Sequence, residues 1–108
     1  MELKDRLINY VKIDTTADPD SDTCPSSKKQ FNLANLLKQE MIDMGFQDVI
    51  LDDNCYLYGT IPSNIDKKVP TVGFIAHMDT APDFSGTNVN PRIITNYDGN
   101  DIKLNEER

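Results

Sequence analysis

The sequence is poor in the residues that build most recognisable sites. Its 108 residues contain one histidine, two cysteines, four phenylalanines and no tryptophan. Two cysteines without a C-x-x-C spacing are too few for a disulfide scaffold or a redox motif. We therefore expect Cys24 and Cys55 to be free thiols of a protein in a reducing compartment.

Long apolar runs are also missing. No apolar stretch approaches the roughly 20 residues that a membrane-spanning helix needs. Residues 1–5 have neither the basic lead nor the apolar centre of a signal peptide. These two absences predict a cytoplasmic protein that has no membrane partner.

Basic residues are in the minority. The chain has 11 Lys and Arg against 18 Asp and Glu, which gives a formal net charge of -7. No basic patch stands out, so we expect no nucleic-acid partner. The chain also lacks a G-x-S-x-G elbow, a P-loop and a dinucleotide fingerprint, which removes support for a serine hydrolase, an NTPase or a Rossmann enzyme.

Apolar periodicity predicts two helices. The first covers residues 2–12, and the second follows Ser26 and Ser27, either of which can act as its N-cap. Gly45 lies just past the end of the second helix, where a left-handed C-cap is expected. The inner stripe of this helix comprises Phe31, Ala34, Leu37, Met41 and Met44, widened by Leu33 and Leu36.

Strand signals follow the second helix. Residues 49–51 and 56–61 predict a hairpin around the turn Asp52-Asp53-Asn54. The apolar run 71–76 predicts a central strand that is buried on both faces. Short strands are also expected near 92–94 and 101–104. This order predicts an α/β layer protein, and because few helices remain to cover the central strand we expect the start of a larger domain.

The segment after the predicted central strand holds the only histidine. His77 falls where a buried strand reaches the edge of its sheet, which is where α/β proteins place their sites. In extended backbone, residues two apart point to the same side, so Asp79 can face the same site as His77. A zinc-bound imidazole commonly donates its second N–H to a carboxylate, and Asp79 is placed to accept it. The spacing H-x-D alone leaves open a structural histidine held by local hydrogen bonds.

The number of ligands limits what this site can do alone. A catalytic zinc site usually has three protein ligands and an open position for water. The chain has one histidine and no H-E-x-x-H motif. Further ligands must therefore be carboxylates or residues from outside the chain.

Several stretches resemble the peptidase T family, the tripeptide aminopeptidases among the co-catalytic zinc metallopeptidases. The broad group is indicated by His77-Met78-Asp79-Thr80 alone, and the longer runs are more specific. These runs are Pro25-Ser26-Ser27 with Gln30, residues 73–83 (GFIAHMDTAPD), residues 85–91 (SGTNVNP), and Asn96-Tyr97 with Gly99 and Asp101-Ile102.

The resemblance implies a partial catalytic domain of a zinc aminopeptidase-like α/β fold, with a mixed central sheet and flanking helices. It makes residues 1–108 the N-terminal portion of that domain, without the smaller inserted domain. It implies two zinc ions as cofactors, with His77 as a metal ligand and Asp79 as the catalytic aspartate that orients it. A metal-activated water would attack the first peptide carbonyl of a tripeptide substrate and release its N-terminal residue.

The other family ligands and the catalytic glutamate have no counterpart in these 108 residues. We therefore expect this chain alone to be inactive and to bind zinc weakly. Two alternatives stay open: a related zinc amidohydrolase or dipeptidase, and a noncatalytic binding module with a structural histidine. Open strand edges also predict self-association into a homo-oligomer.

Overall fold

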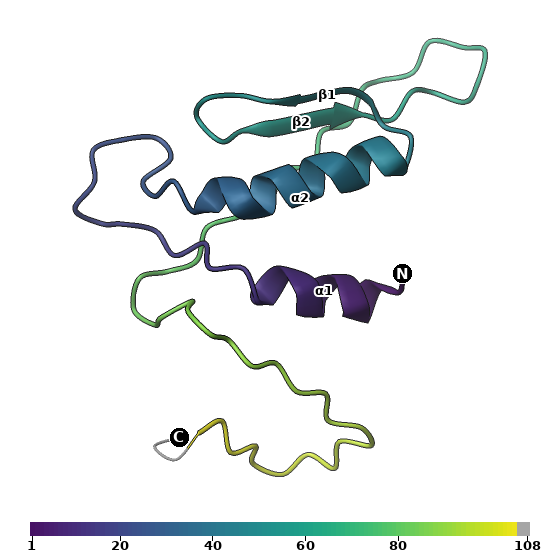
Figure 1. Cartoon of the computed structure of the whole chain (residues 1–108). Coiled ribbons are helices and arrows are strands. Elements are labelled where there is room, and N and C mark those ends of the chain that lie inside the picture. The colour runs from purple at the N-terminus through teal and green to yellow at the C-terminus, as the bar shows by residue number, and fades with distance from the viewer. Residues whose placement is uncertain (106–108) are drawn as a thin grey trace.

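The structure is a computed structural model that describes residues 1–105, so the last three residues of the predicted unit 1–108 lie outside the described residues. The elements are α1 (Leu3–Val11), α2 (Gln30–Asp43), β1 (Gln47–Leu51) and β2 (Leu57–Thr60). Figure 1 shows α2 between the β1–β2 hairpin and α1, with the remaining backbone running away from these elements. Within residues 1–105, no helix has the length and apolar character needed to cross a membrane.

Both predicted helices are confirmed, but the predicted serine cap of the second helix is wrong. Its N-cap is Lys29, which makes no side-chain capping hydrogen bond. The N–H of Gln30 instead donates to the carbonyl of Ser27, at 3.2 Å. Ser26 Oγ is occupied elsewhere, because it accepts the backbone N–H of Asp18 at 3.1 Å. A preceding turn therefore satisfies the first amides of α2, and a serine cap is not needed.

The end of α2 follows the prediction. Gly45 has a φ of 84°, a left-handed conformation that glycine adopts without a steric penalty. Its N–H donates to the carbonyl of Ile42 at 3.0 Å. The chain then reverses and enters β1, so Gly45 fixes the direction in which the hairpin leaves the helix.

The predicted hairpin is also confirmed. β1 and β2 pair antiparallel, with Ile50 opposite Tyr58 and Leu51 opposite Leu57. The turn is held by Asp52, whose carboxylate accepts the N–H groups of Asn54 at 3.0 Å and Tyr56 at 2.8 Å. An aspartate that bonds the backbone two residues on is a common way to close a turn.

The small core lies between α2 and the hairpin. Its buried apolar residues are Leu33, Ala34 and Cys55. The contact is close, because a Cβ added at Gly59 would lie 3.0 Å from Phe46 and 3.1 Å from Met41. The predicted stripe is therefore confirmed at Ala34, while Met44, at its end, is exposed.

α1 packs against the opposite side of α2 through polar groups. Tyr10 donates a hydrogen bond to the carboxylate of Glu40, and Arg6 forms an ion pair with the same carboxylate at 2.9 Å. None of the α1 residues is buried. This helix is therefore attached by a charged contact more than by an apolar one.

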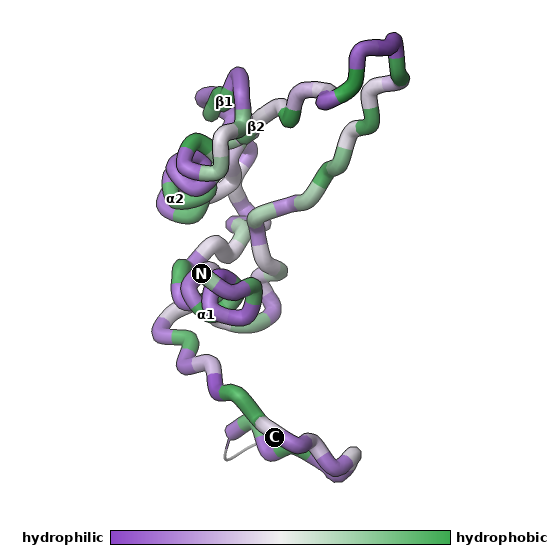
Figure 2. The backbone as a smooth tube through the Cα atoms, turned by 90° about the vertical axis from the view of Figure 1, so that its right-hand side faces the viewer, coloured by the Kyte–Doolittle hydropathy of each residue, from purple (hydrophilic) through white to green (hydrophobic). Residues whose placement is uncertain are grey.

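The predicted central strand at 71–76 is wrong. These residues form no helix or strand, and Phe74 and Ile75 are 95% and 102% exposed. A strand is stable only beside a neighbour that satisfies its N–H and C=O groups, and the described part of the chain supplies none there. Figure 2 shows such hydrophobic stretches along backbone outside the helices and hairpin.

The strands expected at 92–94 and 101–104 are absent from the described residues for the same reason. The sheet has two antiparallel strands, so the predicted mixed central sheet with flanking helices is not present within residues 1–105. The radius of gyration is 17.5 Å, compared with about 13 Å for a compact domain of this length. The α/β content is confirmed, and the larger layered architecture stays a prediction.

Candidate metal-binding site

A single pair of backbone hydrogen bonds joins the His77 segment to the loop after α1. Thr80 donates its N–H to the carbonyl of Thr15 at 3.2 Å and accepts the N–H of Ala17 at 3.0 Å. These bonds form an isolated parallel bridge between Thr16 and Thr80. The bridge therefore holds the backbone in place immediately after the segment that carries His77 and Asp79.

His77 turns its ring back on the two residues that follow it. Nδ1 lies 2.8 Å from the backbone oxygen of Asp79 and 3.1 Å from its carboxylate oxygen Oδ1. A backbone carbonyl oxygen and a carboxylate oxygen can only accept a hydrogen bond. The proton of the neutral ring therefore belongs on Nδ1, and the lone pair of Nε2 remains available as a ligand.

The available nitrogen is on an accessible side chain. The side chain of His77 is 85% exposed, and that of Asp79 is 47% exposed. Within residues 1–105, both hydrogen bonds of the ring are made by Nδ1 and none by Nε2. A metal ion can therefore approach the ring without any rearrangement of a packed core.

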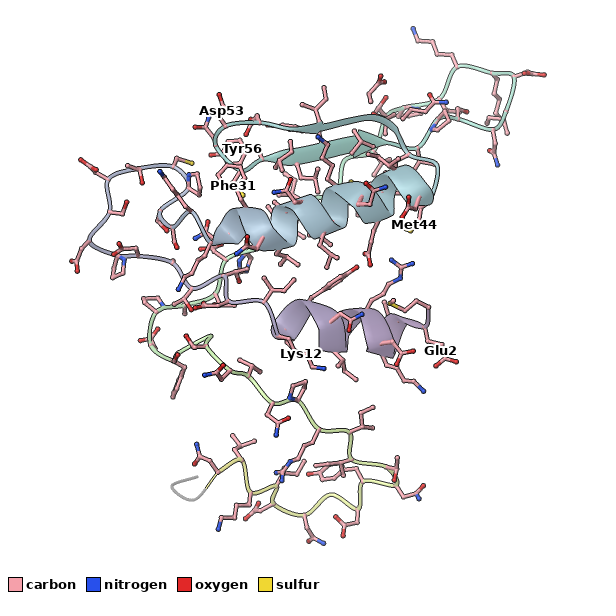
Figure 3. All side chains as sticks on the ribbon, in the orientation of Figure 1. Glu2, Lys12, Phe31, Met44, Asp53 and Tyr56 are labelled. Atoms are coloured by element: carbon pink, nitrogen blue, oxygen red, sulfur yellow. The ribbon has the colours of Figure 1, made fainter. Side chains whose placement is uncertain are left out.

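His77 and Asp79 line a cleft with a volume of about 730 Å³. Its walls come from three parts of the chain: residues 23–26 with Gln30, residues 54–58, and residues 74–79. Figure 3 shows Tyr56 beside the hairpin turn and Phe31 at the first turn of α2, at the same end of this layer. The cleft therefore lies where the segment before α2, the hairpin turn and the segment that carries His77 meet.

The two cysteines also reach this cleft, and both are free thiols. Burial raises the pKa of the Cys55 thiol, which keeps it protonated and makes it a poor nucleophile. The thiol of Cys24 lies 3.7 Å from the hydroxyl of Tyr56, and this hydrogen bond raises the pKa of Tyr56. The raised pKa values mean that neither Cys55 nor Tyr56 is activated for nucleophilic catalysis.

Sequence reasoning missed Asp14, which holds the loop that carries the bridge. One carboxylate oxygen accepts the backbone N–H of Thr16 at 3.0 Å and its hydroxyl at 2.6 Å. The other accepts Lys29 Nζ at 2.9 Å and the hydroxyl of Thr87 at 3.3 Å. The bonds from Thr16 and Lys29 hold the pKa of Asp14 well below its usual range. The pattern Asp-x-Thr, which favours such a turn, was the available signal.

The donor set of the described residues fits zinc only in part. Within residues 1–105, no group of three or more His, Cys, Asp or Glu side chains is arranged to hold a metal ion. His77 fits as one ligand, since its tautomer and exposure leave Nε2 open. Asp79 fits as the carboxylate that accepts the N–H of the other ring nitrogen. The described residues therefore fit one ligand of a zinc site and the carboxylate that orients this ligand.

Known proteins match this chain over almost all of its length. It is 54% identical over 107 residues to a peptidase T of Geobacillus thermodenitrificans and 54% identical over 105 residues to one of another Geobacillus strain. It is 52% identical over 107 residues to a peptidase T of Clostridium botulinum. These alignments cover 97–99% of the chain and 26% of each relative.

No family model matches the chain. The chain spans about a quarter of the length of the curated relatives that it matches. More than half of the aligned residues are nevertheless identical, and the alignment includes nearly every residue of the chain. Over the part that it covers, this chain belongs to the peptidase T family.

Proposed function

We propose that this chain contributes one metal ligand and its orienting carboxylate to a zinc-dependent aminopeptidase that acts on tripeptides. The observation that carries the proposal is the His77–Asp79 contact, which places the ring proton on Nδ1 and leaves Nε2 open. The peptidase T names of the relatives support the reaction class. We further propose that residues 1–108 are part of the catalytic domain.

The residues of this chain have distinct tasks in that reaction. His77 Nε2 would hold one of the two zinc ions, and Asp79 would keep the ring in the ligating tautomer and raise its basicity. Bound zinc supplies Lewis-acid polarisation of a carbonyl and lowers the pKa of a bound water. The other ligands and the general base would come from outside the described residues, which is why we expect the chain alone to be inactive.

Two further properties belong to the same proposal. The free thiols Cys24 and Cys55 support a reducing, cytoplasmic location. The exposed apolar stretch at 71–76 and the open edges of the two-stranded sheet support self-association of the isolated chain.

A chimera tests the function directly. Residues 1–105 would replace the aligned residues of the Geobacillus thermodenitrificans peptidase T, to which the chain is 54% identical. We expect the chimera to hydrolyse tripeptides when zinc is supplied. His77→Ala should lower kcat/KM at least about 100-fold, because even a supporting partner of a ligand is worth about 10–100-fold.

The control is Asp98→Ala in the same chimera, because within residues 1–105 the Asp98 carboxylate bonds only Asn100 of its own turn. An active chimera that keeps its activity as His77→Ala would contradict the proposed role. A chimera that cleaves dipeptides or acylated amino acids in preference to tripeptides would instead favour a related amidohydrolase.

A further inference from the structure

The structure links the Asp14 carboxylate to the histidine ring through one peptide group. The peptide that joins Asp79 to Thr80 has two ends with different partners. Its carbonyl oxygen accepts the Nδ1 proton of His77 at 2.8 Å. Its N–H donates to the carbonyl of Thr15 at 3.2 Å. Because a peptide group is planar, the direction of the N–H fixes the direction of the carbonyl that His77 meets.

The acceptor of that N–H is itself held in place. Thr15 is only 3% exposed, and it lies between Asp14 and Thr16, the two residues joined by the carboxylate. A side chain that binds its own backbone two residues on closes a tight turn. The turn therefore sets where the Thr15 carbonyl points.

Two distant segments hold Asp14 from the other side. Lys29, next to the start of α2, forms an ion pair with it at 2.9 Å, and Thr87 donates its hydroxyl at 3.3 Å. The loop that carries Thr87 also packs closely, because a Cβ added at Gly86 would lie 2.6 Å from Asp14 Oδ1 and 2.8 Å from Thr16 Oγ1. Asp14 therefore joins three parts of the chain at one carboxylate.

We propose that Asp14 is a positioning residue for the histidine site: it orients the Asp79–Thr80 peptide and so keeps the proton of His77 on Nδ1. It acts through the Thr15 carbonyl and touches neither the ring nor the cleft. Free neutral histidine has no such partner at Nδ1, so loss of this order lets the proton redistribute between the two ring nitrogens. The inference concerns the ring alone and does not depend on the reaction under Proposed function.

The test is nitrogen NMR of His77 at a pH where the imidazole is neutral. It is the only histidine in the chain, so its two ring signals need no assignment by mutation. In the unmodified chain we expect Nδ1 to have the protonated shift and Nε2 the unprotonated shift. Asp14→Ala should move both signals toward the average of the two tautomers and lower the exchange protection of the Thr80 amide at least about tenfold, the loss expected for a hydrogen-bonded anchor.

Two comparisons separate positioning from stability. Asp14→Asn keeps an oxygen for Thr16, so it should restore most of the tautomer preference. Asp98→Ala removes a carboxylate that bonds Asn100 in a similar turn, and it should leave the spectrum unchanged. The amides of the hairpin pair Ile50 and Tyr58 report whether the rest of the fold survives.

Each result decides the proposal. A tautomer shift with an intact hairpin and recovery in Asp14→Asn supports it. An unchanged tautomer in Asp14→Ala, or a uniform loss of protection in the hairpin and at Thr80 that Asp14→Asn does not reverse, overturns it. If Asp14→Ala unfolds the chain, Lys29→Met and Thr87→Val take its place, and a tautomer unchanged in both overturns the proposal.

Discussion

Residues 1–60 and residues 61–105 contain similar apolar stretches but reach different structures. The first region forms both helices and both strands, and it contains every buried residue of the described chain: Thr15, Gln30, Leu33, Ala34 and Cys55. The second region forms no regular element beyond the single bridge at Thr80. Helices and hairpins complete their backbone hydrogen bonds with near neighbours in sequence, whereas an internal strand depends on partners from elsewhere.

The histidine site lies at the contact between these regions. His77 and Asp79 belong to the second region, but Thr80 is bonded to Thr15 and Ala17 of the first. The site is therefore ordered by a few polar contacts and not by a core. This difference predicts that core substitutions and site substitutions have separable effects.

The largest effect is expected from Leu33→Ala. Leu33 is buried between α2 and the hairpin, so the substitution should lower the free energy of unfolding by about 2–3 kcal/mol. The matched change in the second region is Ile75→Ala, which removes an exposed side chain and should cost less than about 0.5 kcal/mol. Urea unfolding followed by circular dichroism measures both. Equal losses would show that residues 71–76 are packed and would contradict the comparison.

The second-largest loss of stability is expected from one of two matched glycine substitutions. Gly59→Val adds atoms 3.0–3.1 Å from Phe46 and Met41, and such overpacking should cost about 1–3 kcal/mol. Gly73 has no atom within 4 Å of an added Cβ, so Gly73→Val should be nearly neutral in the same unfolding assay. A destabilising Gly73→Val would place a close neighbour beside the predicted central strand.

The smallest loss of stability is expected when the pH is lowered. The pKa of Asp14 is lowered by its bonds from Thr16 and Lys29, so its contribution to stability is complete above the ordinary aspartate pKa of about 3.9. That contribution is lost as the pH falls from there through the lower pKa of the folded state. Protection of the Thr80 amide should therefore survive at about pH 4 and decline only in stronger acid. Loss of that protection above about pH 5 would show that the carboxylate is not bonded as described.

The local part of the fold was predictable from the sequence. The 3.6-residue periodicity places α2, Gly45 marks its end, and Asp52 closes the hairpin turn. Residues 71–76 carry an equally clear apolar signal, but a pattern cannot show whether a neighbouring strand is present. The predicted strand was therefore wrong in the structure described.

The candidate site was predictable from the sequence only where its contacts are local. The i, i+2 spacing of His77 and Asp79 brings ring and carboxylate together at 3.1 Å. No role was predicted for Asp14: the Asp-x-Thr pattern indicates its turn, but its partners Lys29 and Thr87 lie 15 and 73 residues away. Contacts between residues so distant in sequence leave no local signature.

The most direct test of the histidine site is a zinc titration followed by nitrogen NMR of His77. We predict that zinc moves the Nε2 signal selectively, that binding is weak, and that Nδ1 keeps its proton and its bond to Asp79. A zinc-dependent loss of the Nδ1 proton, or no response of the ring at any zinc concentration in the titration, would contradict the assignment of His77 as a metal ligand.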